Sequence, residues 1–373
     1  MTPAPGRSAA LDGLRGIAIL LVLLLHFTMY GGPRAAGGLD LLVQRFAFAG
    51  WIGVDLFFVL SGFLITGILY DSKGGERYFR NFYARRLLRI APLYYGALVV
   101  FLVLLPALWP GHAGLRSLRQ EGFWYWTYLV NVEIAREGWP GFGMLGHFWS
   151  LAVEEQFYLV WPLAVFLLRR RPLMAVCAGA IVLAVGCRLL LQMAGNAPAA
   201  FVLTPARLDA LAAGALLALA VRGPGGAAAA ARWARPVLIV SAAGLGLLFA
   251  WKRGLPSEDP VVSVAGQALL AALFAALLAL TLAAPPEARG VRWLAAPVLV
   301  FFGRYSYGLY VLHHPLLFLK PAGLSYAALP GWLLFVVGAT GVSVAAALLS
   351  WRFLEKPFLD LKDRFPYGRM PAP

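Results

Sequence analysis

The chain has 373 residues, of which 61% are hydrophobic and only 13% are charged, and its mean hydropathy is +0.75. A soluble domain carries about 25% charged residues, so this composition excludes an ordinary soluble protein and indicates an integral membrane protein. The formal net charge of +15 is better explained by membrane topology than by a nucleic-acid partner, which we do not expect.

The first long apolar segment, Leu11–Phe27, is predicted to be a membrane-spanning helix that is retained rather than cleaved as a signal peptide. Arg15 and His26 lie eleven residues apart in it, which places both side chains on nearly one face, about 16 Å apart along the axis. Asp12, one turn before Arg15, can pair with it. An ionisable group as deep as His26 indicates a functional role, although a hydrogen bond to a neighbouring helix would also explain it.

The second predicted span, Trp51–Tyr70, contains Asp55 and Ser61. A carboxylate at this depth needs a cationic partner, for which Arg15 and Arg86 are the natural candidates. Ser61 is followed by a glycine, so it fits either a polar pocket or the close helix packing that small residues allow.

A basic segment leads into the third predicted span, Ala91–Trp109, and ends with Arg85, Arg86 and Arg89, close to Tyr94. Arg86 and Arg89 are three residues apart and share a helical face. Two guanidinium groups there suit a phosphate-bearing ligand that arrives from the cytosol. Contact with anionic lipid head groups is the simpler explanation of such clusters.

The aromatic stretch 112–147 is broken by Gly and Pro and is predicted to be interfacial or re-entrant. The span after it, Phe148–Leu168, contains two adjacent glutamates. His147 and Glu154 are seven residues apart, so we expect them along one face, with Glu154 pointing inward and Glu155 toward the interface. The alternative is that the glutamate has no role in a site and is simply a carboxylate near the start of a helix, where the helix dipole stabilises it.

A late span, Pro297–Leu319, carries Tyr305, Ser306 and His313, and a second histidine follows directly. Neighbouring residues on a helix diverge by about 100°, so the two histidines cannot easily bind one ion. No cysteine or carboxylate joins them at a ligand spacing, and we expect no metal.

Further apolar segments bring the number of predicted spans to about ten, matched to a bilayer about 30 Å thick. An N-terminus in the cytoplasm places roughly twenty Lys and Arg residues inside and about ten outside, so both termini are expected to be cytoplasmic. We therefore predict an all-α, polytopic membrane protein with one domain over residues 1–373, including a cytoplasmic lead (1–10) and a cytoplasmic tail (352–373). The further spans are Pro172–Leu191, Leu203–Val221, Pro236–Trp251, Val261–Leu282 and Trp332–Trp351.

Five segments resemble, in order, the motifs of the acyltransferase-3 family of membrane acyltransferases, and together they cover nearly the whole chain. They read LDGLRGIAILLVLLLHF, GVDLFFVLSGFLIT, FYARRLLRIAPLYY, HFWSLAVEEQFYLVWP and FFGRYSYGLYVLHHP. Some members of the family add a C-terminal hydrolase-like domain. The chain printed here ends soon after its last predicted span, so a stand-alone member is expected.

The resemblance implies that an acyl group, most often acetyl, moves from cytosolic acyl-CoA to a hydroxyl group. The implied acceptor is a carbohydrate or glycoconjugate of the cell envelope, or a secondary metabolite. The implied setting is a bacterial inner (plasma) membrane, with the lipid bilayer, acyl-CoA as co-substrate and the acceptor as partners.

In such a reaction His26 would act as the general base, or would itself be acylated. Arg15 would bind the donor or stabilise developing negative charge, and Glu154 would orient His26 or bind the sugar. The implied acyl-CoA site comprises Arg85, Arg86, Arg89 and Tyr94, and the implied substrate pocket comprises Asp12, Asp55, Ser61, His147, Tyr305, Ser306 and His313.

A proton-coupled transporter or lipid flippase is the alternative, with the buried Arg, Asp, Glu and His side chains as a proton relay. Such transporters carry Gly- or Pro-broken segments at matching positions of two halves, and the sequence shows no such pair. Consumption of a thioester by the purified protein would separate the two functions.

Overall fold

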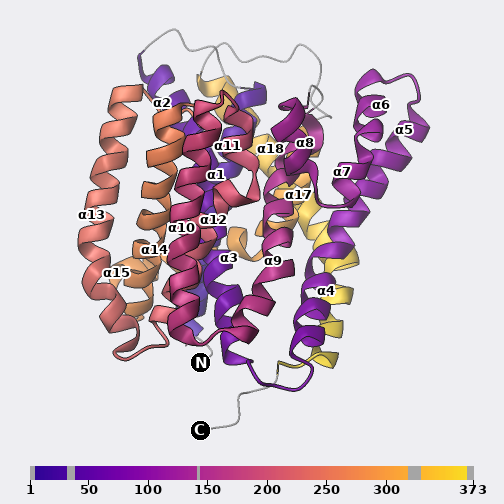
Figure 1. Ribbon diagram of the computed structural model, residues 1–373. Helices are drawn as coiled ribbons and strands as arrows, with labels where there is room; N and C mark the ends of the chain where they lie inside the picture. The colour runs from indigo at the N-terminus through magenta and orange to yellow at the C-terminus, as the bar shows by residue number, and fades with distance from the viewer. Residues whose placement is uncertain (1–4, 32–37, 141–142, 318–328, 368–373) are drawn as a thin grey trace.

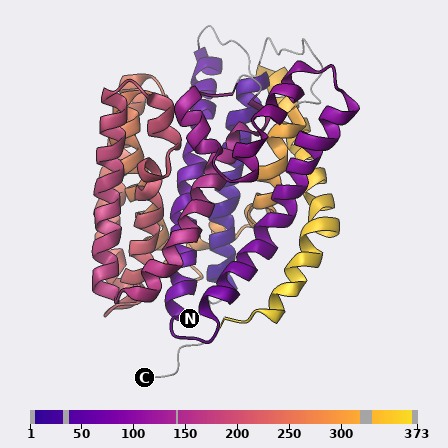
Figure 2. The ribbon, with the colours of Figure 1, turned by 45° about the vertical axis from the view of Figure 1, so that its right-hand side comes forward.

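The computed structural model describes residues 5–31, 38–140, 143–317 and 329–367. All regular structure in these ranges is helical, and the helices form an upright bundle (Figures 1 and 2). The prediction of an all-α, polytopic membrane protein is confirmed.

The α-helices follow one another with few long connections, and short 3-10 or π-helical pieces extend several of them. Their bounds are α1 Pro5–Gly31, α2 Gly38–Phe48, α3 Ile52–Asp71, α4 Tyr78–Leu98, α5 Leu105–Leu108, α6 Ala113–Gln120, α7 Gly122–Trp126, α8 Val130–Glu137, α9 Trp149–Leu167, α10 Arg170–Met193, α11 Ala197–Val202, α12 Thr204–Ala220, α13 Gly226–Lys252, α14 Gln267–Ala283, α15 Arg289–Leu294, α16 Pro297–Arg304, α17 Ser306–Leu316, α18 Leu329–Ser350 and α19 Lys356–Asp360. The connecting 3-10 and π-helical pieces are η1 Ala49–Trp51, η2 Val99–Leu104, η3 Gly143–Phe148, η4 Val262–Gly266, η6 Trp351–Glu355 and η7 Leu361–Arg364.

Nine helical stretches of the described chain are long and apolar enough to cross a membrane, against about ten predicted. The difference lies in the predicted span Pro297–Leu319, whose last two residues are outside the described ranges. The chain leaves helical geometry at Tyr305 (φ −98°, ψ 9°), which divides the segment into α16 and α17. With 8 and 11 residues, neither helix reaches the roughly 20 residues that a span needs.

Two other segments differ in extent from the prediction. The segment between the first two predicted spans contains α2, while residues 32–37 of this segment lie outside the described ranges. The third span begins earlier than predicted, since α4 starts in the basic segment and continues through η2 and α5 to form a stretch of 31 residues. The stretch 112–147 forms α6 to α8 and most of η3, and α6 to α8 are too short to cross on their own.

The helix α1 packs against α3 on one side and α16 on another, and α3 packs along α12. The helix α13 stands at the left edge of the bundle in Figure 1, and most residues in the apolar parts of α10 and α13 are not buried inside the protein. The start of α1, the loop between α3 and α4 and the end of η7 lie at one end of the bundle, which we call the terminus side (Figure 1). The opposite end is the far side.

The contact between α3 and α12 depends on glycine at position 62. A Cβ atom on Gly62 would lie 1.9 Å from the backbone oxygen of Leu211, so only glycine allows the two backbones to approach this closely. The packing interpretation of the Ser61–Gly62 pair therefore holds for its glycine.

We predict that Gly62→Ala lowers the melting temperature of the purified protein in detergent, because the two backbones must separate. The expected loss is about 1–3 kcal/mol or more, as for other overpacked sites. Gly246→Ala in α13 is the matched control, since a Cβ there meets no atom within 4 Å, and it should be neutral or slightly stabilising. Equal melting temperatures for the two variants would contradict the packing account.

Candidate active site

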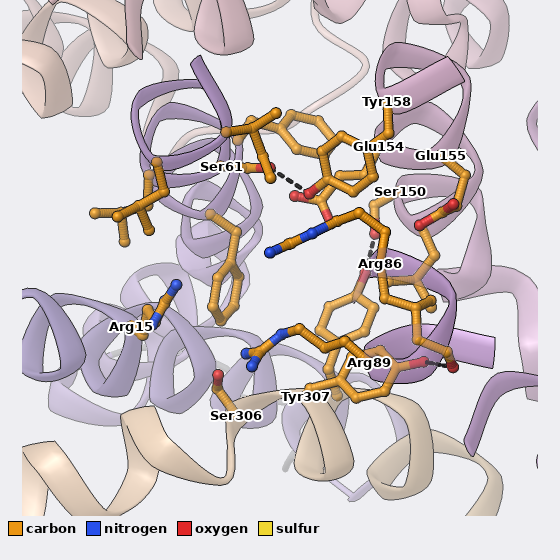
Figure 3. A pocket seen from close by; sticks show the side chains of 18 of the residues that line it. Arg15, Ser61, Arg86, Arg89, Ser150, Glu154, Glu155, Tyr158, Ser306 and Tyr307 are labelled. Carbon is orange, nitrogen blue, oxygen red and sulfur yellow. Dashed lines mark hydrogen bonds between the residues drawn. The ribbon is translucent and has the colours of Figure 1, made fainter. Parts of the chain in front are cut away.

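A small cavity of about 120 Å³, which we call the arginine cavity, lies between α1, α3, α4, α9 and α17. Arg15 from α1 and Arg86 and Arg89 from α4 line it, and Figure 3 shows their guanidinium groups turned toward one another. The helix α4 starts on the terminus side, as α1 does; Arg15 and Arg86 lie in the first halves of these helices, and Arg89 lies at the middle of α4. The cavity therefore lies in the terminus-side half of the bundle.

The arginines differ in how their charge is balanced. Arg15 donates a hydrogen bond to Asp12 across 3.0 Å, which confirms the predicted pair. Within the described residues, Arg86 and Arg89 form no hydrogen bond or ion pair, although Arg86 interacts electrostatically with Glu154. Glu155 also lines the cavity, so the prediction that only one of the two glutamates faces inward is wrong.

Three serines, Ser61, Ser150 and Ser306, add to the polar lining of the arginine cavity. The hydroxyl groups of Ser61 and Tyr158 are hydrogen-bonded across 2.5 Å (Figure 3). Ser306, at the start of α17, lines the opposite wall. Ser61 therefore lines a polar pocket, while its neighbouring glycine serves helix packing.

A second and larger cavity, of about 760 Å³, is lined by His26, His147 and His314, and we call it the histidine cavity. Aromatic side chains form much of its wall, and the loop between α13 and η4 contributes charged residues at its rim. The aromatic lining consists of Phe48, Trp51, Trp139, Trp149, Phe201 and Tyr310, and the charged lining of Arg45, Lys252, Arg253 and Glu258.

The rim loop is held in place by specific contacts. Lys252 donates to Asp259 across 2.8 Å, and the indole N–H of Trp139 donates to Glu258 across 3.0 Å. Burial alone would raise the pKa of Asp259, but hydrogen bonds from Lys252 and from the backbone N–H groups of Val261 and Val262 lower that pKa below its ordinary value.

Four histidines meet at the inner end of the histidine cavity. The ring centroid of His26 lies 4.5 Å from that of His314, 5.0 Å from that of His313 and 6.0 Å from that of His147. His26 Nδ1 is 3.0 Å from His313 Nε2, and His314 Nδ1 is 3.1 Å from His147 Nδ1. Among the described residues, no group of three or more His, Cys, Asp or Glu is arranged to hold a metal ion.

The prediction that His147 and Glu154 lie along one face is wrong. His147 belongs to the 3-10 helix η3, so the α-helical spacing does not apply between the two residues. His147 lines the histidine cavity and Glu154 the arginine cavity. The sequence interpretation did not include His314 among the site residues. It considered His313 and His314 together only as possible ligands of one metal ion.

The two cavities adjoin inside the bundle, where Val54 and Tyr310 line both. The Tyr310 hydroxyl is held by Ser150 across 2.5 Å and by the backbone oxygen of His147 across 2.9 Å. Because α1 is one uninterrupted helix, Arg15 and His26 are about 16 Å apart along its axis. One helix thus presents Arg15 to the first cavity and His26 to the second.

Six of the predicted site residues line neither cavity, namely Asp12, Asp55, Arg85, Tyr94, Tyr305 and His313. Arg85 donates to the backbone oxygens of Lys362 and Phe365 and so ties the C-terminal segment to α4. The Tyr94 hydroxyl donates to the backbone oxygen of Tyr125 across 2.7 Å. Tyr305 packs edge-on against Trp351. These contacts of Arg85, Tyr94 and Tyr305 lie within the protein, and their predicted roles in acyl-CoA or substrate binding stay predictions.

Asp55 also lies outside both cavities, and its predicted partners Arg15 and Arg86 are wrong. Its carboxylate accepts a hydrogen bond from Arg207 of α12 across 2.7 Å, and both side chains are fully buried. A second pair, Arg188 of α10 with Asp209 of α12, lies 2.7 Å apart beside it. The sequence did contain a signal for these pairs: Arg188, Arg207 and Asp209 are charged residues inside predicted spans, and charges at such positions need partners.

Arg207 also supports the wall of the histidine cavity. Its guanidinium carbon lies 5.7 Å from the ring centre of Trp149 and 5.3 Å from that of Phe201. Both rings line the cavity, and cation–π contacts of this kind are worth about 2 kcal/mol when desolvated.

The sequence of this membrane bundle matches a known family. Residues 8–352 match the acyltransferase domain family, and the chain belongs to this family, the acyltransferase-3 membrane acyltransferases that its motifs resemble. Family membership favours an enzyme over the transporter or flippase alternative.

Several curated bacterial proteins are similar in sequence. The peptidoglycan O-acetyltransferase OatA of Listeria monocytogenes is 29% identical over 367 residues, which covers 93% of this chain and 55% of the relative. The putative peptidoglycan O-acetyltransferase YrhL of Bacillus subtilis is 27% identical, over 93% and 54%, and the O-acetyltransferase OatA of Staphylococcus aureus is 25% identical, over 95% and 57%. The chain thus spans about half the length of the relatives it matches. No solved structure matches it significantly.

Proposed function

We propose that the protein moves an acetyl group from acetyl-CoA in the cytosol to a hydroxyl group of a cell-envelope glycan, in the plasma membrane of a bacterium. Family membership and the O-acetyltransferase relatives support the reaction class. The observation that carries the proposal is that two chemically different cavities meet at one helix, one rich in unpaired arginine and one in histidine and aromatic side chains.

The arginine cavity is the proposed donor site. Coenzyme A carries phosphate groups, and guanidinium groups bind phosphate through charge-assisted hydrogen bonds. The cavity volume of about 120 Å³ is small, since one water molecule takes up about 30 Å³ in the liquid. We therefore propose that it holds one anionic group of the donor while the nucleotide stays outside, on the terminus side. The excess of Lys and Arg predicted for that side supports a cytoplasmic location.

The histidine cavity is the proposed acceptor site. Its volume of about 760 Å³ is within the 300–1,000 Å³ of typical ligand pockets. Aromatic rings with polar rims suit a sugar, because a ring face covers the sugar's C–H groups while the rim binds its hydroxyl groups. Its rim loop lies on the far side, so the acceptor would approach from the membrane face opposite the donor.

His26 is the proposed reaction centre. The acceptor oxygen attacks the thioester carbonyl while His26 takes the hydroxyl proton, the C–S bond breaks, and coenzyme A leaves as a thiolate that then takes the proton. Acylation of His26 followed by transfer to the acceptor is the second route. Both routes require the acyl end of the donor to pass Tyr310 and Val54, the side chains that separate the cavities. The offset of about 16 Å assigns Arg15 to donor binding rather than to the reaction centre.

We predict that His26→Gln lowers kcat for acetyl transfer by about 10²–10⁴-fold, the usual contribution of a general base. The assay is the formation of acetylated glycan, together with acetyl-CoA consumption, by the purified protein. His112→Gln is the matched control, because His112 caps α6 and lines neither cavity. Full transfer by a correctly folded His26→Gln protein would refute the assignment.

We further predict that Arg86→Gln and Arg89→Gln each raise KM for acetyl-CoA about tenfold or more, since a hydrogen bond to a charged group contributes about 1.5–3 kcal/mol. Arg85→Gln is the control, because Arg85 contacts the C-terminal segment instead of the cavity. Titration of acetyl-CoA at saturating acceptor measures the difference. If Arg85→Gln raised KM as much as the other two changes, the donor would not bind in the arginine cavity.

A further inference from the structure

We infer that His313 is a positioning residue that fixes the tautomer of His26, so that Nε2 of His26 is the nitrogen with a free lone pair. The sequence interpretation assigned His313 to the lining of a pocket. In the structure its side chain is fully buried and its Nε2 atom lies 3.0 Å from Nδ1 of His26. Which of these two nitrogens carries the hydrogen follows from the remaining contacts of each ring.

The contacts of His313 determine its own tautomer. Its Nδ1 atom lies 2.9 Å from the backbone oxygens of both Leu309 and Tyr310. Carbonyl oxygens only accept hydrogen bonds, so Nδ1 carries the hydrogen. A neutral imidazole has one N–H group, and Nε2 of His313 is therefore an acceptor that faces His26.

The tautomer of His26 follows from that of His313. Nδ1 of His26 lies between two acceptors, Nε2 of His313 at 3.0 Å and the backbone oxygen of Val22 at 3.0 Å. It must therefore carry the hydrogen, which leaves the lone pair on Nε2. Within the described residues Nε2 of His26 forms no hydrogen bond, and the ring lines the histidine cavity.

This arrangement matches what the reaction needs. A lone pair on Nε2 is required whether His26 takes a proton or an acyl group. When Nε2 is then protonated or acylated, the ring becomes positively charged, and its hydrogen bond to His313 becomes charge-assisted and stronger. In a serine protease a carboxylate holds the catalytic histidine in this way. His313 does so without placing a permanent charge in the apolar interior.

The role of Nε2 in transfer rests on the proposed function, whereas the tautomer does not, and the experiment separates the two. The protein is labelled with ¹⁵N-histidine and studied by NMR in detergent, with the His26 signals assigned by their loss in His26→Gln. We expect neutral His26 to be protonated at Nδ1. A His26 protonated at Nε2 would overturn the inference, whatever the activity.

Two variants of His313 test its role. In His313→Gln the longer amide reaches the place of Nε2 and can still accept from His26. In His313→Asn the shorter amide can satisfy only the backbone oxygens of Leu309 and Tyr310. We expect the Asn variant to populate the Nε2-protonated tautomer of His26 and to lose about 10–100-fold in kcat, the size of loss that follows removal of the hydrogen-bond partner that orients a metal-ligating histidine.

KM for acetyl-CoA should not change in either variant, and the Gln variant should retain most of kcat. An Asn variant with the wild-type tautomer and kcat would refute the positioning role. If instead the tautomers behave as expected but His26→Gln keeps full transfer, the proposed function fails while the inference about His313 and the tautomer stands.

Discussion

A charged or polar side chain inside a membrane bundle costs several kcal/mol unless it finds a partner there, and this constraint orders the interior of the protein. Asp55 of α3 pairs with Arg207 of α12, and Asp209 of α12 pairs with Arg188 of α10. Removing one partner of such a buried pair is strongly destabilising, because it leaves an uncompensated charge in the interior. The two pairs therefore link α3, α10 and α12 to one another. Arg207 also contacts the rings of Trp149 and Phe201, which belong to the aromatic wall of the histidine cavity.

The two cavities satisfy the same constraint in different ways. The four histidines bind one another and backbone carbonyl groups, so the cluster needs no charge in its resting state. In the arginine cavity, Arg86 and Arg89 form no ion pair with any described residue. The buried Arg188 and Arg207, by contrast, each pair with an aspartate. Arg86 and Arg89 are therefore available to an anionic ligand, which is the physical basis for the proposed donor site.

The sequence alone predicted those features that depend on helix geometry. The pairing of Asp12 with Arg15 and the offset between Arg15 and His26 need only one regular helix, and α1 is regular. Arg86 and Arg89 share a face for the same reason. The partner of Asp55 is 152 positions away in the chain, so no local spacing could identify it. His147 was misplaced because a 3-10 helix precedes α9, and the apolar character of residues 297–319 gives no sign of the break at Tyr305.

The central claim is that donor and acceptor reach His26 from opposite faces of the membrane, and proteoliposomes test it most directly. Vesicles are sorted by capture of an N-terminal tag, so that the terminus side faces a known compartment, and acetyl-CoA and glycan, neither of which crosses the bilayer, are then supplied on chosen sides. The account predicts acetylated glycan when acetyl-CoA is on the terminus side and glycan on the far side. Product that forms only when both are supplied on the same side would contradict it.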